Sequence, residues 1–117
     1  MKVTPSDFGG AVAVEGYGPG FFRIGRTVIH GPVVVTAAGG AAWGGLEDRA
    51  PLLALSGRVD VLFIGMGPEV AHAPADLVAA LRAGGVAVES LSSPTAARTY
   101  NVTLSEGRRV ACALLPV

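Results

Sequence analysis

The fold is decided by the stretch Val59-Asp60-Val61-Leu62-Phe63-Ile64-Gly65-Met66-Gly67. Its side chains are apolar at consecutive positions from Val61 to Ile64, so a strand built from them is apolar on both faces. Strands of this kind suit the centre of a parallel sheet, where both faces are covered. The glycines at 65 and 67 predict a sharp turn where the strand leaves the sheet. Residues 59–64 are therefore predicted to form a central strand of an α/β fold.

Helix and strand patterns alternate around this stretch. The predicted elements are a helix over 49–56, the strand 59–64, a helix over 74–84, a strand over 86–91, a helix from 93 to about 104 and a strand over 108–115. Asp48 is predicted as the N-cap of the first helix, and Ser93, just before Pro94, as that of the third. The alternation indicates a mixed or parallel sheet with helices packed on it.

The first 45 residues have a different sequence pattern. Short β-type runs at 11–14, 21–24, 27–29 and 33–36 are separated by glycines and prolines. Such residues supply the backbone angles that tight turns need. This part of the chain is predicted to be an antiparallel meander.

Length, charge and hydropathy bound the class of protein. The 117 residues fit a single domain, 1–117, and half of them are hydrophobic. Nine basic and nine acidic residues are spread evenly, which disfavours nucleic-acid binding because phosphates demand clustered cations. No apolar run approaches the roughly 20 residues of a membrane helix, so no membrane insertion is expected. Residues 1–7 lack the apolar segment of a signal peptide, which favours a cytoplasmic location.

The familiar catalytic and cofactor motifs are incomplete. Gly65 and Gly67 begin a dinucleotide fingerprint, but its third glycine position holds Val70. The glycine spacing of residues 39–46 lacks the Lys and Ser/Thr of a P-loop. His30 and His72 are isolated, and Cys112 lies among apolar neighbours typical of a buried, inert thiol. The expectation is a non-catalytic protein with no cofactor and no metal.

The densest polar cluster lies on the third predicted helix. Thr95, Arg98 and Asn101 are spaced three residues apart and share one face, while the alanines at 96 and 97 and the tyrosine at 100 can pack inward. A helix N-terminus favours anions, so the cluster suggests an anion site. The alternative is structural, with Arg98 paired to Glu106 or capping carbonyl groups.

A resemblance to a known family becomes visible at this cluster. The residues that carry it are Tyr17, Gly20-Phe21, Trp43, Ile64-Gly65-Met66-Gly67, Ala96-Ala97-Arg98-Thr99-Tyr100-Asn101, Glu106, Arg109-Val110-Ala111 and Leu114-Leu115-Pro116. The chain resembles the domain of unknown function 498 family, which includes a mitochondrial complex I assembly factor. The resemblance implies a three-layer α/β fold: a central mixed sheet, helices on one side and the N-terminal β-hairpin structure on the other. It implies no established enzymatic activity.

Two function hypotheses follow. The first is an interaction protein that binds another protein, in the manner of an assembly factor. The second is a small-molecule or anion-binding domain, or a weakly defined enzyme, with its site at the C-terminal edge of the parallel strands. The residues of that second site would be Trp43, Gly65, Gly67, Ser92, Arg98 and Asn101. If Trp43, Gly65, Gly67 and Arg98 line one pocket, the second hypothesis gains; separate packing roles favour the first.

Overall fold

The computed structural model describes residues 10–117. The expectation that residues 1–7 form no signal peptide therefore lies outside the described residues. The elements in chain order are β1 (Val14–Gly18), β2 (Phe21–Ile24), β3 (Thr27–His30), β4 (Val33–Thr36), β5 (Gly39–Ala42), α1 (Ala50–Leu53), β6 (Val61–Gly65), α2 (Ala75–Ala83), β7 (Ala87–Leu91), α3 (Ser93–Ser105) and β8 (Val110–Leu114).

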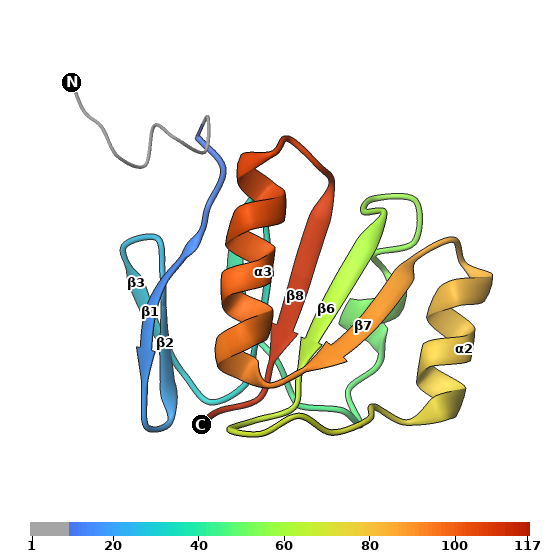
Figure 1. The fold of residues 1–117 in the computed structure, drawn as a ribbon, viewed down its shortest axis with the longest axis horizontal. Helices are drawn as coiled ribbons and strands as arrows, with labels where there is room; N and C mark the ends of the chain where they lie inside the picture. Colours follow the sequence, from blue (N-terminus) through green and yellow to red (C-terminus); the bar gives the residue numbers. More distant parts are fainter. Residues whose placement is uncertain (1–9) are drawn as a thin grey trace.

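These strands form two sheets. The small sheet is antiparallel, in the order β1-β2-β3. The large sheet has the order β5-β4-β8-β6-β7, in which β6 runs parallel to β7 and β8, and β4 runs antiparallel to β5 and β8. Figure 1 shows the small sheet at one end of the molecule, next to α3, and α2 at the other end. A mixed central sheet with helices and an N-terminal antiparallel sheet confirms the predicted fold class.

The large sheet is covered on both faces, as the sequence of β6 predicts. Leu62 and Ile64 belong to the core under α1 and α2, whereas Phe63 belongs to the core under α3 and the small sheet. The helices therefore do not all share one side: α3 lies on the side of the small sheet. The chain moves from β6 to β7 in one direction across the sheet and from β7 to β8 in the other. Right-handed crossovers in opposite directions place their helices on opposite faces.

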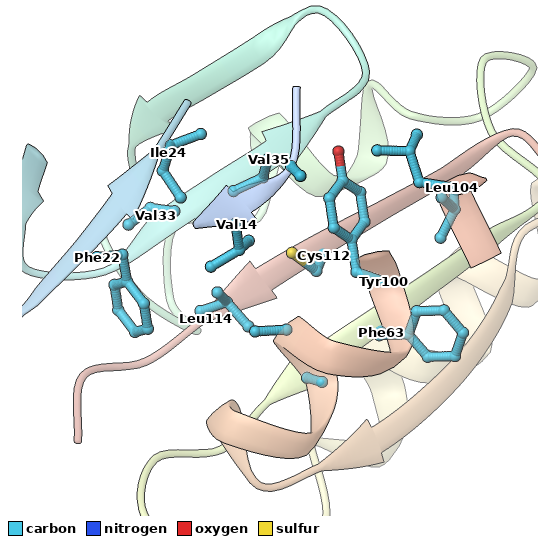
Figure 2. Packing of buried hydrophobic residues seen from close by; sticks show 14 residues of the cluster. Val14, Phe22, Ile24, Val33, Val35, Phe63, Tyr100, Leu104, Cys112 and Leu114 are labelled. Atoms are coloured by element: carbon cyan, nitrogen blue, oxygen red, sulfur yellow. The ribbon is translucent and has the colours of Figure 1, made fainter. Parts of the chain in front are cut away.

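The core on the α3 side joins the two sheets. Phe22 and Ile24 come from the small sheet, Val33 and Val35 from β4, and Tyr100 from α3 (Figure 2). They surround Cys112, whose side chain is completely buried. The predicted burial of this thiol is confirmed. Burial also raises the pKa of the Cys112 thiol. It is likewise the largest cause of the raised pKa of the Tyr100 hydroxyl.

We expect alkaline pH to destabilise the fold through these two groups. In the unfolded chain the thiol loses its proton near its ordinary pKa of 9.0, and the phenol near 10.0, but both keep their protons in the folded state. The unfolded chain then binds fewer protons, so the free energy of unfolding falls as the pH rises above about 9. Urea titrations between pH 7 and 11 measure this. A Cys112→Ala variant should delay the decline by about one pH unit; identical pH profiles for the two proteins would contradict the assignment to Cys112.

Three local predictions are corrected by the structure. Residues 39–42 lie in the segment 38–46, which the sequence predicts to be a loop, but they form the edge strand β5, which pairs with β4 although its side chains are small. Asp48 is not the N-cap of α1; its carboxylate accepts a hydrogen bond from the backbone N–H of Gly44. The N-cap of α3 is Ser92, one residue earlier than expected, and Ser93 is already helical and fully buried.

Two features of residues 10–117 bear on function. No helix within residues 10–117 is long and apolar enough to cross a membrane. In the same range, no group of three or more His, Cys, Asp or Glu side chains is arranged to hold a metal ion.

Candidate functional site

The C-terminal edge of the parallel strands is closed by the chain itself. Ser93 stands at its centre: its hydroxyl donates to the carbonyl oxygen of Leu115 at 2.5 Å and accepts from the N–H of Gly67 at 2.9 Å. The backbone N–H of Ser93 donates in return to the carbonyl oxygen of Gly67 at 2.7 Å. These bonds link the turn after β6, the start of α3 and the C-terminal tail. Ser93 therefore has a structural role.

The backbone N–H groups in the first turn of α3 are already hydrogen-bonded within the protein. The N–H of Ser93 is bonded to Gly67, Pro94 has no N–H, and the N–H of Thr95 donates to the side chain of Ser92. The N–H of Ala96 donates to the carbonyl oxygen of Ser92. Anion binding at a helix N-terminus relies on free N–H groups. The geometry therefore gives no support to an anion site at this helix end.

Gly65 is required by the close approach of α3 to β6. A Cβ atom added at Gly65 would lie 2.7 Å from the Cα of Ser93 and 2.9 Å from a methyl carbon of Leu114. The first of these neighbours is backbone and cannot rotate away. The glycine therefore serves packing and not ligand access.

We expect Gly65→Ala to destabilise the protein. The added methyl group overpacks the junction of β6 and α3, and such substitutions cost about 1–3 kcal/mol. Chemical denaturation followed by far-UV circular dichroism measures the loss. Gly16→Ala is the matched control, because a Cβ at Gly16 meets nothing within 4 Å and its φ is not positive. A Gly65→Ala variant as stable as Gly16→Ala would refute this packing role.

Trp43 lies in the other core. It is 4 % exposed and packs with the residues under α1 and α2, while its indole N–H donates to the carbonyl oxygen of Asp48 at 2.8 Å. Its backbone N–H donates to the carbonyl oxygen of Pro32. As the only Trp, in a loop of Gly and Ala with little other apolar bulk, Trp43 is predicted to be buried, and this is confirmed. The side chain holds the loop between β5 and α1 on the sheet.

Arg98 and Asn101 do lie together, in a groove between α3 and β1. The groove encloses about 190 Å³ and is lined by Val14, Glu15, Gly16, Tyr17, Pro94, Ala97, Arg98 and Asn101. Arg98 is exposed, and its guanidinium approaches the hydroxyl oxygen of Thr95 at 3.5 Å. Tyr17, 47 % exposed, faces the groove from β1. Within residues 10–117, Arg98 makes no ion pair with Glu106, the alternative that the sequence left open.

Asn101 holds β1 at this groove. Its amide oxygen accepts from the N–H of Val14 at 2.9 Å, and its amide nitrogen donates to the carbonyl oxygen of Val14 at 2.8 Å. β1 is an edge strand of the small sheet, and its register shifts between Val14 and Gly16. The Asn101 side chain replaces the neighbouring strand that Val14 lacks.

We expect Asn101→Ala to loosen β1 without unfolding the rest of the molecule. Two half-buried backbone groups of Val14 would lose their partners, at a cost of about 1–3 kcal/mol. Amide hydrogen exchange at Val14 should accelerate relative to exchange at Cys112 in the core. Val102→Ala, an exposed position on the same helix, is the control. Unchanged exchange at Val14 in Asn101→Ala would show that another contact anchors the strand.

The six residues predicted for a ligand pocket are thus not brought into one pocket. Trp43 anchors a loop on one face of the sheet, while Arg98 and Asn101 line a groove on the other. Gly65, Gly67 and Ser92 serve the junction between β6 and α3. Trp43, Gly65 and Gly67 have separate packing roles, which favours the interaction hypothesis, whereas Arg98 is exposed in the groove.

Among residues 10–117, Tyr17 is the one aromatic side chain of the groove, and the predicted site did not include it. The sequence did contain a signal, since Tyr17 and the block 96–101 both carry the family resemblance. Nothing in the sequence places them side by side, because they are about 80 residues apart and meet only when α3 packs beside β1.

Fold and groove together define a three-layer α/β protein whose candidate site is a surface groove rather than a pocket at the sheet edge. The chain belongs to the family described as protein of unknown function (DUF498/DUF598), whose model matches residues 14–115.

Named relatives extend this result. An uncharacterised protein of Rhodobacter capsulatus is 51% identical over 117 residues, which cover 100% of this chain and 94% of that protein. The zebrafish (Danio rerio) NADH dehydrogenase [ubiquinone] 1 alpha subcomplex assembly factor 3 is 25% identical, over 99% of this chain and 71% of its own length. A solved structure described as an outer membrane protein from Bartonella henselae superposes with a TM-score of 0.83 at 31% identity, covering 92% of this chain and 97% of that one.

Proposed function

We propose that this protein is a non-catalytic binding protein that holds another protein during the assembly of a larger complex, and that the groove between α3 and β1 contacts that partner. The similarity to an assembly factor over nearly the whole chain is the observation that carries the proposal. The assembly role belongs to that relative by name and is extended here to this chain.

The groove offers side chains that suit a protein partner. Tyr17 and Arg98 face it from opposite walls, and Tyr and Arg are enriched among the residues that dominate binding energy at interfaces. Glu15 adds a charge of the opposite sign beside them. At about 190 Å³ the groove is smaller than the roughly 300–1,000 Å³ of typical small-molecule sites.

The absence of catalysis is supported by the state of the candidate nucleophiles. The hydroxyl of Ser93 is bonded on both sides to backbone groups, and the thiol of Cys112 is buried with a raised pKa. His30 lies on β3 and His72 in the segment between β6 and α2, and within residues 10–117 neither imidazole is hydrogen-bonded to Ser93 or Cys112.

Site-specific photo-crosslinking in native cells tests the proposal. A photoreactive amino acid replaces Tyr17 in the groove or, as the control, exposed Ala79 on α2 of the opposite layer. We expect a discrete crosslinked protein from position 17 alone, and its loss when Arg98→Glu is added. The same products at both positions, or an undiminished product with Arg98→Glu, would exclude the groove as the contact surface.

A further inference from the structure

A cavity larger than the groove between α3 and β1 lies at the edge of the large sheet where the parallel strands β6 and β8 begin and β4 ends. It encloses about 430 Å³, within the range of ligand sites. Its lining consists of Thr36, Ala37, Ala38, Leu55, Arg58, Val59, Arg108, Arg109 and Val110. Neither the predicted site nor the groove between α3 and β1 includes any of these residues.

The walls of this cavity combine apolar side chains with an excess of positive charge. Leu55, Val59 and Val110 are buried core residues that form its apolar part. Arg109 is held in place by Asp60 at 2.8 Å and by the carbonyl oxygen of Gly57 at 3.2 Å. Asp60 is the carboxylate beside the rim, and its pKa is lowered mainly by its hydrogen bond from Arg109.

Two guanidinium groups remain available at the rim. Among residues 10–117, no carboxylate lies within ion-pairing distance of Arg58 or Arg108. Arg108 acts on Asp60 only at longer range, adding a smaller contribution to its lowered pKa. One carboxylate thus faces three arginines, and charge complementarity calls for an anionic group at the rim.

A second cavity of about 420 Å³ adjoins the first and shares Thr36, Ala38, Leu55 and Arg58 with it. Its other walls are Val34 of β4, the residues of β5 and, from α1 and its C-terminal flank, Pro51 and Ala54. The side chains of β5 are too small to fill this space, since residues 39–42 are two glycines and two alanines. An apolar chain could extend along this strand from a group held by Arg58.

We propose that these two adjoining cavities together bind an organic carboxylate with an apolar chain. The carboxylate pairs with the guanidinium groups of Arg58 and Arg108, whose planar donor pairs match a carboxylate. The apolar chain of the ligand covers Leu55 and the part of the second cavity between β5 and α1. Burial of each CH₂ group there is favourable by about 0.8 kcal/mol. This site lies apart from the groove of the proposed function and does not depend on it.

Amide NMR titration of the full chain tests the proposal, with octanoate as the probe. Octanol, which has the chain without the charge, and inorganic phosphate, which has charge without the chain, complete the set. We expect saturable octanoate shifts confined to residues 36–42, 54–59 and 108–110. The Arg58→Gln/Arg108→Gln variant should weaken octanoate binding by about tenfold and leave octanol unchanged. Arg23→Gln/Arg82→Gln, at exposed positions outside both cavities, is the matched control.

A second variant tests the cavity without changing charge. Ala38→Phe places a ring at a residue that lines both cavities and should abolish the response to both octanoate and octanol. Three results would each overturn the proposal: no saturable octanoate shift, equal binding by the two double-arginine variants, or octanoate binding that survives Ala38→Phe. Equal shifts with phosphate alone would also overturn it, because they would show a general anion response without a role for the chain.

Discussion

Trp43→Ala is expected to lower the free energy of unfolding by about 3–5 kcal/mol, the usual cost of truncating a buried aromatic side chain. Trp43 is 4 % exposed, and Leu52, Leu62 and Ile64 belong to the same core cluster. The loss also removes the indole N–H that donates to the carbonyl oxygen of Asp48 at 2.8 Å. For a chain of this size the melting temperature should fall by about 10–20 °C.

Far-UV circular dichroism is the appropriate measurement, since Trp43 is the only tryptophan and its fluorescence disappears with the substitution. Trp43→Phe keeps most of the apolar bulk and removes only the donor, so its effect should be clearly smaller. If Trp43→Ala melted at the wild-type temperature, the loop between β5 and α1 would not depend on this anchor.

Tyr100→Ala is expected to have an effect of similar size on the opposite face of the sheet. The side chain is completely buried between α3, β8 and the small sheet, and its hydroxyl donates to the carbonyl oxygen of Val12 at 2.7 Å (Figure 2). Truncation leaves a cavity where the two sheets join and should cost about 3–5 kcal/mol.

Tyr100→Phe separates the hydrogen bond from the packing. It should cost only about 1–2 kcal/mol, because the ring remains and one acceptor loses its donor. Hydrogen exchange in β1 and β2 should accelerate more in Tyr100→Ala than in Tyr100→Phe. Equal losses of stability in the two variants would mean that the hydroxyl, and not the ring, holds the small sheet in place.

The groove between α3 and β1 and the two adjoining cavities can be tested independently. Arg98→Glu bears on partner contact, whereas Arg58→Gln/Arg108→Gln bears on carboxylate binding, and these residues lie on different surfaces. One proposal can therefore fail while the other stands.

Local features were predictable wherever a short stretch carries its own physical signal. The strand 59–64 is apolar at consecutive positions, which requires cover on both faces, and both faces are covered. The helix expected over 74–84 is α2, Ala75–Ala83, because its apolar stripe and terminal glycines are local signals. Burial of Cys112 followed in the same way from its apolar neighbours, and burial of Trp43 followed from its place as the only Trp, in a loop of Gly and Ala.

Strand β5 shows the limit of such reasoning. Gly39-Gly40-Ala41-Ala42 has low strand propensity, yet the segment is paired along β4. A turn brings it back beside a strand that is already fixed in the sheet, and the backbone hydrogen bonds of that pairing outweigh the weak propensity. Its small side chains then leave the cavity beside α1, which a reading of the segment as a loop could not reveal.

The sequence by itself determined the fold class and the main buried side chains, since hydrophobic periodicity and turn residues act over a few neighbours. Tertiary structure alone decided which polar side chains meet. Asn101 binds the backbone of Val14 across 87 residues, and Ser93 joins two segments that are 22 and 26 residues away. The crossover from β7 to β8 places α3 beside the small sheet, so that Arg98 faces Tyr17 and not Trp43. Such long-range contacts depend on the order and handedness of strand connections, which no local pattern encodes.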